Sequence, residues 1–237
     1  MSLLRKWFNR LSPSGGQRTP VHRSPVCRPQ VELLEARQLL STLSAISWHS
    51  GGVSHHSVYA IGGDNGVYVS TDGGAFTALG GYALGISAGL DASGNPEVYA
   101  IGGDNSLFVN NGGGFVGLGG YVKQISGSVN NLVYAIGVDD SVQVNNGGGF
   151  VGLGGYALDI SAGLDASGNP EVYVIGWDHS LFVNNGGGFV GLGGHVLEIS
   201  APSFGPAFSG DLCYAVGSDH GGYLFQAGFN PLGGYIL

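Results

Sequence analysis

A fivefold internal repeat fills residues 43–237 and restricts the folds that this chain can adopt. Its best-kept segment, a short apolar run that ends in glycine, begins at Val58, Val98, Val133, Val172 and Cys213, with spacings of 40, 35, 39 and 41 residues. Residues 82–120 and 156–194 are identical at 35 of 39 positions, which indicates the duplication of a two-repeat unit. The fold must therefore be built from five similar units.

Two further markers keep step with this run. A Leu-Gly-Gly triplet begins at Leu79, Leu118, Leu153, Leu192 and Leu232. An Ile-Ser pair, which we assign to the first strand of each unit, begins at Ile46, Ile86, Ile125, Ile160 and Ile199. The whole unit is thus repeated, not one motif within it.

Each unit contains four short apolar runs, and none is long enough for a helix. In the second unit these runs are residues 84–89, 98–101, 107–109 and 115–118, separated by Asp, Asn, Gly and Pro residues typical of turns. Four strands in about 39 residues is the size of one β-propeller blade. We predict an all-β fold over residues 42–237, a five-bladed β-propeller with four short antiparallel strands per blade.

Side-chain size predicts the order of strands within a blade. The first run carries Ser87, Ala88 and Gly89, which suit a crowded central channel, whereas later runs carry the bulky Tyr99, Phe108 and Phe115, which are expected to fill the widening space between blades. The first strand is therefore expected to be innermost. The chain ends at residues 235–237 with the opening of another first strand, and the body begins at 43–47 with the remainder of one, so the two ends should meet. Closure within one chain gives a monomer, and closure between chains gives a ring-mediated oligomer.

The net charge of −8 is divided unevenly along the chain. Seven of the eight basic residues lie before position 42, against only Glu32 and Glu35, so this head carries +5. From residue 42 onward, 14 acidic residues face a single Lys123, a charge of −13. The body cannot neutralise a phosphate backbone, and we exclude nucleic acid as its partner.

The head, residues 1–41, is interpreted as a disordered or weakly helical basic leader outside the fold. Residues 3–11 alternate apolar and basic side chains at helical spacing, which suits contact with a membrane surface during export, although a frayed terminus gives the same pattern. No apolar run is long enough to span a membrane. Residues 28–29 with 33–41, Arg-Pro followed by Leu-Leu-Glu-Ala-Arg-Gln-Leu-Leu-Ser, resemble the LEPR-XLL segment of exported planctomycete proteins. This resemblance implies an extracellular or cell-surface location.

The repeat also resembles the tectonin type of β-propeller lectin. In the second and third units the shared features are Gly102, Asp104, Phe108, Gly112-Gly113, Phe115, Leu118-Gly119-Gly120 and Ile125-Ser126. The resemblance covers residues 43–237 and implies a lectin-like propeller that binds carbohydrate.

Antiparallel strands bring the second turn and the Gly-Gly link of each blade to one face of the predicted disc. The turns carry Asp64, Asp104, Asp139, Asp178 and Asp219, and the links are followed by Tyr82, Tyr121, Tyr156, His195 and Tyr235. Aromatic rings beside carboxylates and amides suit the apolar faces and hydroxyl donors of sugars. The structural alternative is that each Asp caps its own turn and each Tyr belongs to a strand face.

One turn departs from its sister copy. Trp177-Asp178-His179 stands where the second unit has Gly-Asp-Asn, which predicts an exposed tryptophan added to one blade, unless the turn has simply drifted. The candidate ligand-binding residues are Trp177, Asp178, His179, Asp104, Asn105, Tyr82, Tyr121, Tyr156 and His195.

Metal and catalytic chemistry have little support. His49, His55 and His56 lack the spacing of a known zinc site. The segments 91–97 and 165–171 supply carboxylates that calcium could use, but a hairpin loop explains them as well. Cys213 stands where other units have valine and is expected to be a buried hydrophobe. With no nucleophile elbow, phosphate loop or metal motif, we predict a non-enzyme without a cofactor.

Two functions remain open for the body. The first is a multivalent carbohydrate-binding module of the cell exterior, whose partners are glycans or glycoconjugates. The second is a protein-binding or wall-associated scaffold without sugar specificity. Weak sites repeated around a ring gain avidity on a polymeric ligand, which favours the first.

Overall fold

All regular elements among residues 43–202 and 212–236, the part of the chain that the computed structural model describes, are β-strands, as predicted. The strands are β1 (Leu43–Ser50), β2 (Val53–Ile61), β3 (Val67–Thr71), β4 (Thr77–Gly80), β5 (Gly85–Leu90), β6 (Pro96–Ile101), β7 (Leu107–Asn110), β8 (Val116–Gly119), β9 (Val122–Gly127), β10 (Val133–Gly137), β11 (Ser141–Asn145), β12 (Phe150–Leu164), β13 (Pro170–Gly176), β14 (Leu181–Asn184), β15 (Phe189–Gly193), β16 (Val196–Ser200), β17 (Cys213–Gly217), β18 (Gly222–Phe225) and β19 (Phe229–Gly233). The leader, with its LEPR-XLL-like segment and Cys27, lies outside the described residues.

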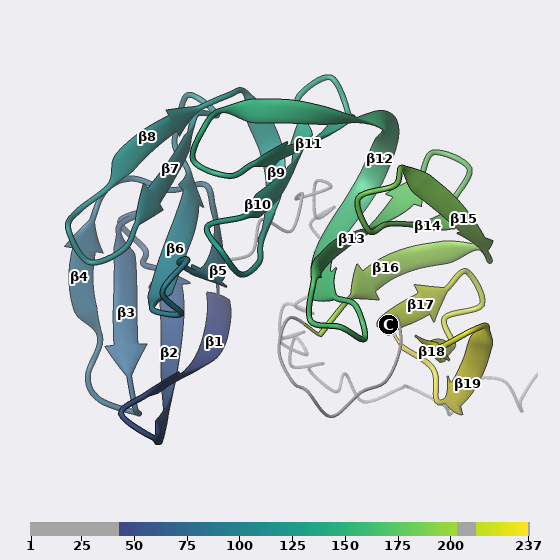
Figure 1. The fold of residues 1–237 in the computed structure, drawn as a ribbon, viewed down its shortest axis with the longest axis horizontal. Coiled ribbons are helices and arrows are strands. Elements are labelled where there is room, and N and C mark those ends of the chain that lie inside the picture. The colour runs from purple at the N-terminus through teal and green to yellow at the C-terminus, as the bar shows by residue number, and fades with distance from the viewer. Residues whose placement is uncertain (1–42, 203–211, 237) are drawn as a thin grey trace, which may run out of the picture. The chain divides into compact units, whose positions relative to one another are not determined.

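The strands form antiparallel sheets that follow the repeats in order (Figure 1). We number them one to five: β1–β4, β5–β8, β9–β11 with the first half of β12, the second half of β12 with β13–β15, and β16–β19. The prediction of four separate short strands is wrong at β12, which runs unbroken through two units. Because Tyr156 pairs with Ser141 beyond the Gly-Gly link, the ladder of the third sheet continues directly into the fourth.

The hydrophobic core lies between consecutive sheets, because alternate residues of each second strand face opposite neighbours. In β6, Val98 and Ala100 pack with residues of the first sheet, whereas Tyr99 and Ile101 pack with residues of the third. Four such clusters join sheets one to five in succession. Each sheet therefore depends on its neighbours to bury both faces.

A serine hydroxyl joins the first strand of each sheet to the first strand of the next. The main-chain N–H donors and serine acceptors are Ala88 and Ser44 (2.9 Å), Gly127 and Ser87 (2.8 Å), Ala162 and Ser126 (2.8 Å), and Ala201 and Ser161 (2.8 Å). We call these four hydrogen bonds the serine links. They require small residues in the first strands, which agrees with the prediction that these strands are innermost.

The serine links correct one assignment made from the sequence. The Ile-Ser marker of the first unit was placed at Ile46, but Leu43-Ser44-Ala45 occupies the position of Ile86-Ser87-Ala88. Ser44 pairs with Tyr59 as Ser87 pairs with Tyr99. The β1–β2 hairpin is longer than the others, and this insertion moves the second Ile-Ser pair away from the link position.

The outer faces of the first and fifth sheets are exposed in the described residues. Tyr214 of β17 is 44% exposed, whereas its counterparts in the four preceding sheets are at most 7% exposed. Leu43 of β1 is 60% exposed, and its counterpart Ile86 is 1% exposed. No core cluster among residues 43–202 and 212–236 joins these two sheets. Closure into a five-bladed ring therefore stays a prediction.

Over the same described ranges, no helix is present that has the length and apolarity needed to cross a membrane.

Candidate ligand-binding site at the sheet junctions

The residue after each Leu-Gly-Gly triplet is positioned by a main-chain hydrogen bond of the residue that follows it. The next residue donates its N–H to the carbonyl of a turn residue in the preceding sheet. These pairs are Ala83 and Asn65 (2.9 Å), Val122 and Asn105 (2.9 Å), Ala157 and Asp140 (3.0 Å), Val196 and His179 (2.8 Å), and Ile236 and His220 (2.8 Å). All five acceptors have positive φ angles of 61–68°. Asn105, a predicted ligand residue, thus has a main-chain role in positioning its junction.

A cavity of about 330 Å³ lies at the junction of the first and second sheets. The structure brings together two predicted residues there, Tyr82 from the link and Asp104 from the turn, with Phe108 and Phe115 also lining the cavity. Tyr82 is 55% exposed, and a Cβ atom on Gly103 would lie 3.2 Å from its ring. The glycine turn therefore leaves room for the tyrosine beside the carboxylate.

The junction of the fourth and fifth sheets has an equivalent cavity of about 350 Å³. His195 takes the place of Tyr82 and Asp219 that of Asp104, with Tyr223 and Phe229 at the two aromatic positions. Equivalent positions of the repeat therefore line a cavity at both junctions, but an imidazole is present only in the second.

The third and fourth sheets meet at the exposed Trp177. Its indole is 64% exposed and approaches the ring of Tyr156 edge to face, with centroids 6.5 Å apart. Asp178 follows in the same turn. His179 does not join this pair and instead stacks on His195 of the next junction, with centroids 4.9 Å apart. The predicted triplet is thus divided between two neighbouring junctions.

The second and third sheets meet at Tyr121, which is also exposed. Its carbonyl accepts the N–H of Val138 at 3.1 Å, and Asp139 follows in that turn. Lys123 forms an ion pair with Asp140, the residue after Asp139. This pair occupies the single basic side chain of residues 42–237.

The five turn aspartates cap their own turns, as the structural alternative predicted. In the second sheet, Asp104 accepts the main-chain N–H and the hydroxyl of Ser106, both at 3.0 Å. In the first sheet Gly66 replaces that serine, and Tyr68 supplies the hydroxyl to Asp64 at 2.9 Å. The hydrogen bonds of Asp219 in the fifth sheet match those of Asp64, and the hydrogen bonds of Asp178 in the fourth sheet match those of Asp104. In each of these four turns a hydroxyl group donates to the aspartate, either from a serine two residues later or from a tyrosine four residues later.

These hydrogen bonds determine the charge of the junctions. Main-chain donation from Ser106 holds the pKa of Asp104 below its usual range, and the corresponding bonds from Gly66, Ser180 and the Tyr223 hydroxyl do the same for the pKa values of Asp64, Asp178 and Asp219. The carboxylates are therefore ionised at neutral pH. A carboxylate has about four acceptor positions, so each keeps capacity for a ligand.

The acidic segments considered for calcium are hairpin turns. Asp91 Oδ1 accepts the main-chain N–H groups of Ser93 and Asn95, each at 2.8 Å, and Asp165 repeats this arrangement. Glu97 points away from the turn into the core, where the hydroxyl of Tyr99 donates to it at 2.6 Å. Asp91 thus caps the turn while Glu97 lies in the core, so the two carboxylates do not face a common site.

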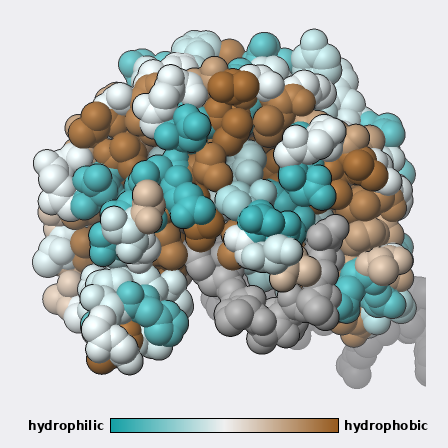
Figure 2. Space-filling model, in the orientation of Figure 1, coloured by the Kyte–Doolittle hydropathy of each residue, from teal (hydrophilic) through white to brown (hydrophobic). Residues whose placement is uncertain are grey.

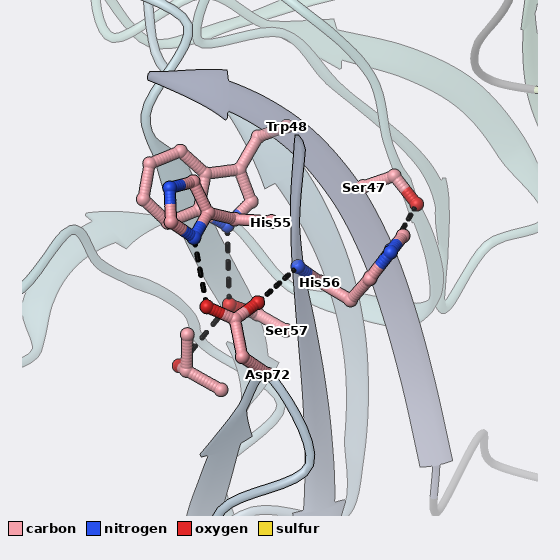
Figure 3. A network of polar contacts seen from close by, with 7 residues as sticks. Ser47, Trp48, His55, His56, Ser57 and Asp72 are labelled. Atoms are coloured by element: carbon pink, nitrogen blue, oxygen red, sulfur yellow. Dashed lines mark hydrogen bonds and ion pairs between the residues drawn. The ribbon is translucent and has the colours of Figure 1, made fainter. Parts of the chain in front are cut away.

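Two histidines of the first sheet, His55 and His56, belong to a polar network that joins β1 and β2 to Asp72 at the end of β3 (Figure 3). His49 is hydrogen-bonded to Ser54 instead. His55 stacks on Trp48, with centroids 4.5 Å apart, and its Nδ1 lies 2.7 Å from Asp72 Oδ2. The other carboxylate oxygen of Asp72 accepts the N–H of His56 at 2.9 Å, and the two bonds hold the pKa of Asp72 below its usual range. Among the described residues, no group of three or more His, Cys, Asp or Glu side chains is arranged to hold a metal ion.

Cys213 is fully buried in the core between the fourth and fifth sheets, as predicted for a small hydrophobe. Burial raises the pKa of its thiol to about 12.

Sequence reasoning missed the aromatic walls of the cavities. Phe108 and Phe115 were interpreted as filling between blades, yet both line the first cavity. The neighbouring glycines carried the signal, because a Cβ atom on Gly102 would lie 2.8 Å from Phe108 and one on Gly81 would lie 3.1 Å from Phe115. Because these two glycines have no side chain, none covers the adjacent parts of the Phe108 and Phe115 rings.

The face of the molecule in Figure 2 carries both apolar and hydrophilic side chains, and hydrophilic side chains separate the apolar ones.

No family model and no curated protein matches this chain. Solved structures do. The lectin of the fungus Aleuria aurantia, described as a six-bladed β-propeller with a novel mode of fucose recognition, matches with a TM-score of 0.53 and 19% identity over 83% of this chain and 78% of its own. AofleA from Arthrobotrys oligospora matches with 0.55 and 18% over 83% and 74%. SapL1 lectin, solved with α-methyl fucoside, matches with 0.53 and 20% over 83% and 81%.

The likeness is not confined to lectins. Yeast RCC1 (Prp20), solved with Kap60 bound to it, matches with a TM-score of 0.53 and 10% identity over 72% of this chain and 54% of its own. At these identities the comparisons establish an all-β, propeller-like fold. Six blades in the Aleuria lectin against five repeats here leave the blade number a prediction.

Proposed function

We propose that this protein is a non-catalytic, multivalent carbohydrate-binding protein of the cell exterior, with its sites at the sheet junctions. The observation that carries the proposal is the repeated junction itself, where an aromatic or imidazole side chain and an ionised carboxylate share a cavity. Aromatic faces bind the apolar faces of sugar rings, and carboxylates accept hydrogen bonds from hydroxyl groups.

The solved neighbours support this choice and suggest the first ligands to test. The Aleuria, Arthrobotrys and SapL1 proteins are lectins or share their fold, and fucosides are named with two of them. Fucosides therefore belong among the sugars to be titrated. The neighbours also support the prediction that the chain is not an enzyme.

The proposal includes closure of the five sheets into a ring of five blades. The first sheet carries its own copy of the site residues, Asp64, Tyr68 and Phe76, without a link residue before them. Tyr235, exposed at the end of the fifth sheet, is the missing link residue in the repeat pattern. Closure would complete a fifth junction, and five equivalent sites would gain avidity on a polymeric glycan.

Replacement of Trp177 by glycine, the residue at the corresponding position 103, tests the junction of the third and fourth sheets directly. We expect calorimetric titration of residues 1–237 with a panel of neutral sugars, fucosides and amino sugars to give measurable heat for at least one of them. For that ligand, Trp177→Gly is expected to weaken binding at this junction about tenfold, or about 1.4 kcal/mol.

Val190→Ala is the matched control, because Val190 is an exposed apolar residue of the same sheet on its edge strand. It should leave the titration unchanged. Absence of heat across the whole panel would contradict the proposed function.

The second candidate, a protein-binding scaffold, is favoured by the RCC1 likeness alone. A panel-wide negative titration would favour it.

A further inference from the structure

The further inference rests on the proposed function and concerns the chemical class of sugar. It starts from the scarcity of lysine and arginine at the junctions. Residues 42–237 contain no arginine and one lysine, Lys123, which is paired with Asp140. The junction turns carry the ionised carboxylates described above. A ligand that enters a junction cavity therefore meets negative charge that no lysine or arginine offsets.

The turn that forms the cavity also uses its own hydrogen-bond donors. In the second sheet, the N–H of Gly102 donates to the carbonyl of Ser106 at 2.8 Å, and the N–H of Asn105 donates to Gly102 at 3.0 Å. The N–H and hydroxyl of Ser106 both donate to Asp104. These four donors are thus used within the turn, while the Asp104 carboxylate keeps acceptor positions for a ligand that brings donors.

The aromatic walls favour the same kind of ligand. The Tyr82 ring lines the first cavity with Asp104, and the exposed Tyr156 and Trp177 rings lie against each other in the junction whose turn carries Asp178. An organic ammonium group is attracted both to a carboxylate and to the face of an aromatic ring. It also carries three N–H donors, which suits a cavity that offers acceptors.

We infer that the junction sites select saccharides that carry a free, protonated amine, that is, deacetylated amino sugars. The sugar ring lies against the aromatic side chain, and the ammonium group is bound by the turn carboxylate. Acidic sugars are excluded, because their carboxylates would face an aspartate at each junction without an arginine to bind them.

The test compares a glucosamine oligomer with the N-acetylated oligomer of the same length. The titrations use the full chain at about pH 6, where an amine of ordinary α-amino pKa is protonated and the turn carboxylates remain ionised. The glucosamine oligomer is expected to bind at least about tenfold more tightly, with an affinity that falls as salt is added. The N-acetylated oligomer should show little dependence on salt.

Variants separate the junction carboxylates from the general negative charge of the body. The double variant Asp104→Asn/Asp219→Asn keeps an acceptor oxygen for each turn and removes two charges from the cavities. It should lower the affinity for the glucosamine oligomer several-fold more than that for the N-acetylated oligomer, because the amide keeps an acceptor for hydroxyl groups but loses the charge that binds the ammonium group. The control Asp91→Asn/Asp165→Asn removes two charges from turns of the same kind that lie at the β5–β6 and β12–β13 hairpins. Thermal melting checks that all variants fold.

The outcomes are distinct. Equal binding of the two oligomers, or tighter binding of the N-acetylated one, overturns this inference and leaves the proposed function intact. Equal losses in the two double variants also overturn it, because binding would then follow net charge alone. If neither oligomer nor any sugar of the panel binds, the proposed function fails together with the inference.

Discussion

Replacement of Gly127 by alanine is expected to destabilise the protein by about 3 kcal/mol, the upper part of the range for overpacking a filled site. Gly127 ends β9 and donates its N–H to the Ser87 hydroxyl. A Cβ atom there would lie 2.4 Å from the carbonyl oxygen and 2.9 Å from the carbonyl carbon of Ala88. Both are main-chain atoms of the neighbouring first strand, so relief requires two sheets to move apart. Chemical denaturation measures the loss.

Gly63→Ala is the control for Gly127→Ala. Gly63 also has an ordinary φ angle, but no atom lies within 4 Å of its Cβ position. The control is expected to change stability by less than about 0.5 kcal/mol, as surface substitutions usually do. Equal, small effects of the two variants would show that the first strands are not in close contact.

Replacement of Tyr99 by phenylalanine is expected to cost about 2–3 kcal/mol at neutral pH, because it removes the hydrogen bond to a buried carboxylate. The hydroxyl of Tyr99 donates to Glu97 at 2.6 Å, and both side chains are buried. Burial raises the pKa of Glu97, so the folded state holds its proton more strongly than the unfolded state. The contribution of Glu97 to stability therefore increases as pH falls through the raised pKa and is lost above it.

The loss in Tyr99→Phe should accordingly shrink on acidification, since a protonated Glu97 needs the hydroxyl less. Denaturation at several pH values measures this trend. Tyr134→Phe is the control, because Tyr134 is buried at the same position of the third sheet, where Leu132 replaces Glu97. A loss in Tyr134→Phe as large as that in Tyr99→Phe, or one that does not change with pH, would contradict the assigned role of the bond.

The strands and turns could be predicted from the sequence because their signals are local. Each turn is marked by Asp, Asn and Gly residues whose side chains and φ angles shape that turn alone, such as Asp104 and Asn105. The alternation of Val98 and Tyr99 in β6 similarly predicts a strand packed on both faces. Repetition then extends each local inference to five places.

The features that the sequence did not predict depend on pairing between distant strands. The position of the first serine link at Ser44 follows from the pairing of β1 with β2 along the whole hairpin, which places Ser44 opposite Tyr59. The buried direction of Glu97 follows from its place opposite Gly89, which leaves room for it. The aromatic walls of the cavities arise where two sheets meet. Side-chain type alone could not distinguish filling from lining for Phe108 and Phe115.

The central claim is that the five sheets close into a ring within one chain, and the serine links offer its most direct test. Ser200 is the fifth serine of the series, and Ala45 is the remaining counterpart of Ala88 and Ala201. In a Cys27→Ser/Cys213→Val background, the pair Ala45→Cys/Ser200→Cys is oxidised and analysed by mass and electrophoresis. The observed link Ser161 to Ala201 supplies the positive control, Ser161→Cys/Ala201→Cys. Closure predicts a disulfide within one chain for both pairs. A disulfide between chains, or none at 45 and 200 while the control forms, would contradict it.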